Sequence, residues 1–261
     1  MDYKHQLEIV KELNVEGTLR TDCPFCMNRN TFDVTNKDGV ILWNCFHASC
    51  EAKGGSGDKF SKEDVERFVS QEKQLHNHKF IMPKTFVNFA VNTKARAYLD
   101  KYGITNTNAR VMYDVKQERV VFLIENQGEV VSATGRAYGN FQPKWFKYSK
   151  SEVPFITGNN REIAIIVEDC VSACAIEVKC GFTGIALMGT SLQESFIEHI
   201  TNSASNVVIC LDRDATDKCF DMKNKLESKV NAYIWMIDED LKSFSDDKMK
   251  EWKGKICRMI S

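Results

Sequence analysis

From residue 163 onward, short apolar runs alternate with longer segments of helical pattern. The strand-like runs cover residues 163–167, 184–188, 207–211 and 233–237. The helical segments lie at about 171–178, 192–199 and 218–229, with an amphipathic terminal helix at 242–259. Strands and helices that alternate in this way build a parallel sheet with helices packed on its faces. The second half of the chain is therefore predicted to be an α/β domain.

Acidic residues directly follow the first and third of these predicted strands. Glu168 ends the first, and Asp212 and Asp214, separated by a single arginine, end the third. Carboxyl ends of parallel strands meet at one edge of a sheet, and neighbouring carboxylates repel each other unless a cation neutralises them. Oxygen ligands of this kind suit Mg²⁺ or Mn²⁺. The three acids predict a metal site for phosphoryl chemistry, with Asp240 as a further candidate ligand; ordinary solvated loop acids are the alternative.

Four cysteines with the spacing of a zinc site lie in the first fifty residues: Cys23, Cys26, Cys45 and Cys50. Two predicted strands, 31–34 and 40–43, separate the pairs, and an Asp-Gly hairpin turn at 36–39 joins these strands. The hairpin would bring the two pairs together, as tetrahedral zinc requires. His47 is a poorly placed alternative ligand, one residue beyond Cys45. The pattern predicts a zinc ribbon whose folding depends on structural Zn²⁺.

Composition limits the class of protein. The chain has 261 residues and a net charge of −1, so any nucleic-acid site must be a local patch. No apolar run approaches the roughly 18 residues of a membrane span, and the charged N-terminal segment does not resemble a signal peptide. We therefore expect a cytoplasmic protein without a membrane partner. In that reducing compartment, clustered cysteines indicate metal, and the six cysteines beyond residue 50 are expected to fill cores.

The middle of the chain carries a local basic patch. A glycine-rich segment at 51–58 predicts a flexible boundary, a helix is expected at 61–74, and His76 and His78 fall in a polar linker. Further on, we expect a helix at 93–102 and strands at 119–124 and 130–136. The segment 136–150 interleaves basic and aromatic residues without an acid, as suits phosphate pairing and base stacking. The alternative is that its aromatic rings lie in the core and its lysines in water.

A strand that ends in Glu, followed by a later strand that ends in Asp-x-Asp, resembles the TOPRIM domain of topoisomerases, primases and some nucleases. The order of modules is similar to that of DnaG-type primases, in particular the small stand-alone primases of bacteriophages. The segments Trp43–Cys50, Arg119–Phe122, Gly135–Arg136 and Pro143–Lys144 resemble the zinc-binding and basic motifs of that family. The resemblance implies four segments: a zinc ribbon at 1–55, a linker and helix at 56–78, a basic subdomain at 79–160 and a TOPRIM subdomain at 161–261.

This resemblance implies template-dependent synthesis of short RNA primers on single-stranded DNA from ribonucleoside triphosphates. Glu168, Asp212 and Asp214 would form the catalytic metal site, and the zinc ribbon would bind the template. The chain contains no P-loop motif, so a separate replicative helicase and a DNA polymerase are the expected partners. Triphosphate or template phosphates would be bound by four basic residues: Arg119, Arg136, Lys144 and Lys147.

The chain departs from the TOPRIM pattern at one position. The family often has a second acid four residues after the Glu, where this chain has Ser172; Asp169 stands next to the Glu instead. The number of metal ions is therefore left open. Two other readings remain: a TOPRIM nuclease that uses the same carboxylates to cut, and a non-enzymatic DNA-binding protein that resembles the RecR recombination mediators.

Overall fold

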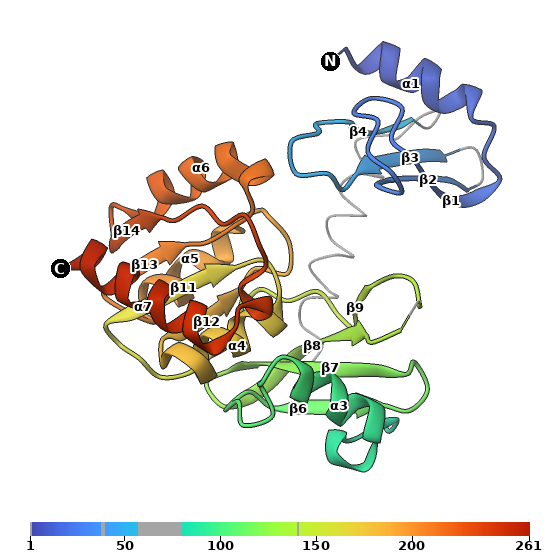
Figure 1. Ribbon diagram of the computed structural model, residues 1–261. Coiled ribbons are helices and arrows are strands. Elements are labelled where there is room, and N and C mark those ends of the chain that lie inside the picture. The colour runs from blue at the N-terminus through green and yellow to red at the C-terminus, as the bar shows by residue number, and fades with distance from the viewer. Residues whose placement is uncertain (1, 38–39, 57–79, 140) are drawn as a thin grey trace. The chain divides into compact units, whose positions relative to one another are not determined.

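The computed structural model describes residues 2–37, 40–56, 80–139 and 141–261 (Figure 1). The chain divides into two compact units, Met1–His78 and Lys79–Ser261. The predicted helix at 61–74, the two linker histidines and the Asp-Gly dipeptide of the predicted turn lie outside the described residues. Within the described segments, no helix is long and apolar enough to cross a bilayer.

The first unit is an antiparallel sheet with helix α1 (Tyr3–Glu12) packed against it (Figure 1). The predicted hairpin strands correspond to β2 and β3, and the loops that carry the cysteines lie at the ends of the strands. The four strands pair in chain order: β1 (Gly17–Thr21), β2 (Phe32–Lys37), β3 (Val40–Cys45) and β4 (Lys53–Ser56).

The glycine-rich segment that we predicted to be a flexible boundary is in part a strand. Lys53–Ser56 pairs with β3 as β4, so the prediction was wrong for these residues. Gly54 faces the ring of Trp43 so closely that an added Cβ would stand 2.3 Å from a ring carbon. The Trp43 indole N–H in turn donates to Gln6 Oε1 of α1 at 3.0 Å. Gly54 thus provides room for a buried tryptophan. From the sequence alone, a glycine that is needed for close packing cannot be distinguished from one in a flexible linker.

The second unit begins with a five-stranded antiparallel sheet. Helix α3 (Thr93–Lys101) packs against it, and the strand and helix predicted near 119–124 and 93–102 are present. The strands pair in chain order: β5 (Phe86–Asn88), β6 (Val111–Asp114), β7 (Arg119–Asn126), β8 (Glu129–Ala137) and β9 (Trp145–Lys147).

The predicted parallel sheet follows, with one unpredicted strand. An antiparallel edge strand, β10, pairs with β12, whereas the four predicted strands are parallel to one another. Three residues, Phe155–Thr157, are too few to carry a strand pattern in the sequence. In sheet order the strands are β10 (Phe155–Thr157), β12 (Thr183–Ala186), β11 (Ile163–Val167), β13 (Asn206–Ile209) and β14 (Asn231–Ile234).

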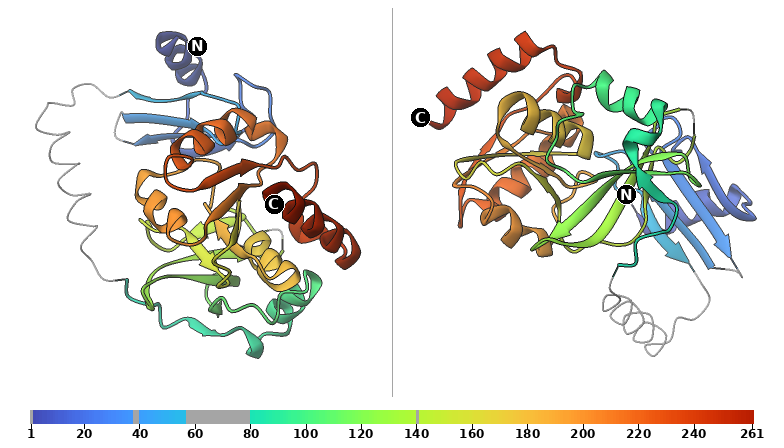
Figure 2. Two further views of the ribbon diagram at one scale, coloured as in Figure 1. Left: turned by 90° about the vertical axis from the view of Figure 1, so that its left-hand side faces the viewer. Right: turned by 90° about the horizontal axis from the view of Figure 1, so that it is seen from below.

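Helices cover both faces of this sheet. Figure 2 shows α4 and α7 on one face and α5 and α6 on the other. The predicted terminal helix starts later than expected, because Leu241–Ser243 forms a separate 3₁₀ turn, η3, before Ser245 caps α7. The helices are α4 (Cys170–Cys180), α5 (Glu194–Thr201), α6 (Thr216–Leu226) and α7 (Asp246–Ile260).

The two sheets of the second unit share one core. Phe122 of β7 meets Phe155 of β10 edge to face, with ring centroids 5.9 Å apart. Helix α4 is buried over most of its length, including Cys170, Cys174 and Cys180. Of the six cysteines beyond residue 50, all but Cys257 are buried, which confirms their expected place in the core.

Glu177 ties helix α4 to the segment that precedes β6. The residue is 8% exposed, and its carboxylate accepts hydrogen bonds from the hydroxyls of Thr107 and Thr157. It also accepts from the backbone and side-chain amides of Asn108. These donors compensate the buried carboxylate for its lost hydration. The hydrogen bonds therefore hold α4 both to the segment before β6 of the antiparallel sheet and to Thr157 of the parallel sheet.

Gly184 of β12 offers a test of how closely α4 packs on the sheet. A Cβ added there would lie 2.1 Å from the carbonyl oxygen of Ala173, which belongs to the helix backbone. We therefore expect Gly184→Ala to destabilise the protein by roughly 1–3 kcal/mol in denaturant unfolding. Gly254→Ala is the matched control, because Gly254 lies inside α7 with nothing within 4 Å of an added Cβ. That variant should gain about 0.5–1 kcal/mol; equal effects of the two changes would contradict the packing argument.

Candidate functional site

The three acids predicted to gather lie at the carboxyl edge of the parallel sheet. Glu168 directly follows β11. Asp212 comes after β13 and forms an isolated parallel bridge with Ile237, which follows β14. Asp214 lies in the short 3₁₀ turn Arg213–Ala215. Because β11 and β13 pair in parallel, with Ile166 opposite Ile209, their ends meet at the same edge.

A small cavity of about 20 Å³ lies at this edge, large enough for roughly one water molecule. Its polar wall consists of carboxylates and one hydroxyl residue, and its apolar wall comes from the strand ends. The polar lining residues are Glu168, Asp169, Ser172, Asp212 and Asp240.

The carboxylates at this edge repel one another, and the pKa values of two of them are raised. Loss of hydration raises the pKa of Glu168, and the charges of Asp169, Asp212 and Asp214 raise it further. Loss of hydration also raises the pKa of Asp212, with Asp240 and Asp214 adding to the rise. A positive charge bound among these acids would relieve the part of both pKa shifts that comes from the neighbouring carboxylates.

Sequence reasoning missed the cation that the protein itself places here. Lys242, in η3, is 9% exposed, and its Nζ lies 2.8 Å from Asp169 Oδ2 and 2.8 Å from Asp240 Oδ1. These contacts raise the pKa of Lys242 despite its burial. The sequence predicted only that residue 242 begins an amphipathic terminal helix, and it carried no sign that this lysine is buried.

Asp169 has two structural roles. Its Oδ1 accepts from the backbone N–H groups of Val171 and Ser172 at 2.8 and 3.0 Å, which caps the N-terminus of α4. Its Oδ2 pairs with Lys242. Ser172, which occupies the place of the family's second acid, is 5% exposed and contributes a small side chain to the cavity wall.

The three consecutive acids Asp238, Glu239 and Asp240 are each paired within the protein. Arg213, which separates the two aspartates of the motif, points to Asp238, with Nε 2.5 Å from Oδ1. Glu239 pairs with Lys248 at 2.6 Å on the surface. Asp240, the further candidate ligand, faces Lys242 instead of standing alone.

The predicted phosphate-binding residues lie on β7, β8 and β9 and on the loop before β9. Arg136 stacks on Trp145 with its guanidinium carbon 5.2 Å from the ring centroid, while Lys144 and Lys147 are exposed. Burial raises the pKa of the Cys170 thiol and the charge of Lys147 opposes that rise, so the lysine acts within electrostatic reach of α4. Arg119 is 3% exposed and makes long bonds of 3.5 and 3.4 Å to the carbonyls of Gly135 and Lys144.

Most aromatic side chains of the basic segment pack inward. Tyr138 bonds to Tyr113, Trp145 lies against Phe122, and Tyr148 donates to the buried Asp114 at 2.6 Å. These contacts favour the alternative in which the rings belong to the core. Phe141 is 52% exposed and stays available for stacking.

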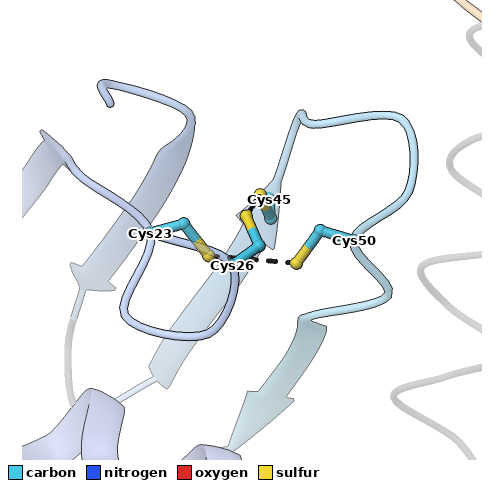
Figure 3. A group of neighbouring side chains, drawn as sticks. All are labelled: Cys23, Cys26, Cys45 and Cys50. Carbon is cyan, nitrogen blue, oxygen red and sulfur yellow. Dashed lines mark hydrogen bonds between the residues drawn. The ribbon is translucent and has the colours of Figure 1, made fainter. Parts of the chain in front are cut away.

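The four cysteines of the first unit converge from three loop and strand ends (Figure 3). Their sulfur atoms all lie within 4.8 Å of one another, with Cys23 and Cys50 3.9 Å apart and Cys26 and Cys45 3.7 Å apart. Ligands at zinc–sulfur distance on a tetrahedron are ~3.8 Å apart, so this spacing fits one zinc ion. His47 is not in the group, although its backbone N–H donates to Cys45 Sγ at 3.4 Å.

The thiol environment also suits a metal. Burial opposes ionisation of Cys26, yet hydrogen bonds from the side chain and backbone of Asn28 lower its pKa to about 6. Burial and the neighbouring sulfurs raise the pKa of Cys50 to about 12. Four thiolates therefore coexist here only with a cation among them. Among the described residues, no other group of three or more such ligand atoms is drawn together as closely.

Comparison with known proteins supports a primase-like fold. The family described as Toprim-like matches residues 165–243, the segment that carries the acids and Lys242. Two curated relatives are named DNA primase: one from Thermotoga maritima, 25% identical over 77% of this chain, and one from Halalkalibacterium halodurans, 34% identical over 40%. The chain spans 37% and 19% of the lengths of these two relatives.

Among solved structures, the chain is similar to the zinc-binding and RNA polymerase domains of the Aquifex aeolicus primase. The TM-score is 0.50 at 17% identity, with 98% of this chain and 82% of that chain covered. A likeness at this level concerns the fold alone. The arrangement of an N-terminal antiparallel sheet with a cysteine cluster and a C-terminal Toprim-like sheet thus matches that of DnaG-type primases.

Proposed function

We propose that the chain is a DNA primase of the DnaG type, which makes short RNA primers on single-stranded DNA. The observation that carries the proposal is the meeting of Glu168, Asp212 and Asp214 at one edge of a Toprim-like sheet. The named relatives and the basic strands of the same unit support it. A phage origin, a cytoplasmic location and separate helicase and DNA polymerase partners belong to the same proposal.

The carboxylate edge suits Mg²⁺ or Mn²⁺. Its donors are hard oxygens whose mutual repulsion a cation would relieve. The carboxylates are less tightly gathered than the cysteines, which fits an ion that keeps several waters and takes further ligands from substrate phosphates. Asp212 and Asp214 would hold this ion, and Glu168 would complete the site.

The reaction joins a nucleotide 3′-hydroxyl to the α-phosphate of an incoming triphosphate, and pyrophosphate leaves. A bound divalent ion supplies neutralisation of charge on the attacking and leaving oxygens. Glu168, whose pKa burial and neighbouring acids raise, is suited to accept the hydroxyl proton. Arg136, Lys144 and Lys147 would contact triphosphate or template phosphates. Arg119 would act indirectly, since its buried guanidinium donates to the backbone carbonyls of Gly135, next to Arg136, and of Lys144.

The four cysteines would hold Zn²⁺ in a closed structural site, and the sheet around it would bind the single-stranded template. The unit has a small core centred on Phe32, Val34 and Trp43. A domain of this size commonly depends on its metal for stability.

Cys45→Ser is expected to abolish zinc binding and to unfold the first unit, because Cys45 Sγ is one of the four clustered sulfur atoms and its strand pairs with β2 and β4. Metal analysis and circular dichroism measure the two effects. Cys257→Ser, a change in helix α7 of the second unit, should keep the full zinc content. Stoichiometric zinc in the Cys45 variant would contradict the ligand set.

Asp212→Ala is expected to reduce primer synthesis at least about 100-fold while the protein stays folded, because a metal-held transition state is stabilised by several kcal/mol. The assay uses single-stranded DNA, Mg²⁺ and labelled ribonucleotides, with short products resolved by size. Asp221→Asn, which changes an exposed acid on α6, is the control and should retain activity. Undiminished synthesis by the Asp212 variant would refute the site, and cleavage of DNA without nucleotides would favour the nuclease reading.

Asp212→Asn should stabilise the protein at pH 7 when no divalent ion is present. A carboxyl whose pKa is higher in the folded state costs stability once pH exceeds that value, so removing its charge relieves the cost. Because Asp212 is exposed, the gain is at most about 1 kcal/mol, or about 2–4 °C in melting temperature. The difference from wild type should shrink as pH falls toward the ordinary range of carboxyl groups. A lower melting temperature of the variant at pH 7 would contradict the repulsion.

A further inference from the structure

The carboxyl edge of the parallel sheet contains a positive charge that belongs to the protein. Lys242 Nζ lies 2.8 Å from one carboxylate oxygen of Asp169 and 2.8 Å from one of Asp240. The side chain is nine-tenths buried, in contrast to Lys248, which pairs with Glu239 nearby at the surface with 45% of its side chain exposed. A buried ammonium held by two carboxylates keeps its place far better than an exposed one.

The acids at this edge fall into two groups by their partners. Asp169 and Asp240 share Lys242, and Asp169 is also fixed as the cap of α4. Glu168 and Asp212 line the same small cavity at the ends of the paired strands β11 and β13, and neither forms an ion pair with Lys242. An ammonium is a compact charge with three donors, so two carboxylates can be held at once without a metal.

We propose that Lys242 is a positioning residue that permanently occupies one cation position of this edge, so that the site takes a single divalent ion between Glu168, Asp212 and Asp214. Asp240 is then a partner of the lysine and not a metal ligand. This inference rests on the proposed function. It also explains why the chain can have Ser172 where the family often has an acid. A site in which Lys242 supplies one of the positive charges needs fewer carboxylates to bind metal.

Mn²⁺ binding to the zinc-loaded full chain, followed by electron paramagnetic resonance without nucleotide, tests the proposal. The wild type should bind one ion at this edge, and Lys242→Gln should bind a second ion because Asp169 and Asp240 lose their counter-charge. Lys242→Arg should restore a stoichiometry of one. Lys248→Gln, which removes an exposed lysine of the same sign, is the control and should bind as the wild type does. A folded Lys242→Gln protein with unchanged stoichiometry and affinity would overturn the proposal.

Asp240→Asn tests the ligand assignment independently of any change at the lysine. It should weaken Mn²⁺ binding less than about fivefold, the effect of one screened charge, whereas Asp212→Asn should weaken it about tenfold or more. Equal losses in the two variants would make Asp240 a ligand and refute the inference. Since these measurements need no primer synthesis, a chain that makes no primers but shows this binding pattern would refute the proposed function alone.

Discussion

Like charges held at the ends of neighbouring parallel strands are the constraint on which the second unit depends. Parallel pairing of β11 with β13 leaves little freedom to separate Glu168 from Asp212, since Glu168 directly follows β11 and Asp212 lies three residues after the end of β13. The protein offsets this repulsion with Lys242, with the amides at the start of α4 and with ion pairs for the acids after β14. What remains uncompensated is the pair of acids with raised pKa values, where an added cation has most to gain.

In the first unit, like charges would also be held close together, because its four clustered cysteines become thiolates when they bind a metal ion. Its four thiols come from loops and strand ends that antiparallel pairing brings together, and their spacing already suits one tetrahedral ion. The Trp43 ring packed over Gly54 and bonded to Gln6 supplies much of the rest of a small core. The tryptophan thus stabilises a unit that has few other buried side chains, and a metal ion bound by the four thiols would add to that stability.

The sequence predicted those features that rest on local pattern. Strands β11 and β13 are short apolar runs, and the cysteine spacing is a property of neighbours in the chain. Features that depend on distant contacts escaped: Gly54 looked flexible because its tryptophan partner is eleven residues away, and β10 was too short to have a periodicity. Lysine is usually a surface residue, and the burial of Lys242 depends on its ion pairs with Asp169 and Asp240, which the sequence does not reveal. Likewise, nothing in its neighbours showed that Arg119 would be buried.

Helix α4 joins the two ends of this arrangement. Its cap, Asp169, belongs to the acidic edge, and Glu177 near its other end binds the segment that leads into the antiparallel sheet. The eight residues from one acid to the other span about 12 Å of rigid helix. Because the same helix is anchored at both ends, α4 fixes the position of the acidic edge relative to the antiparallel sheet of this unit.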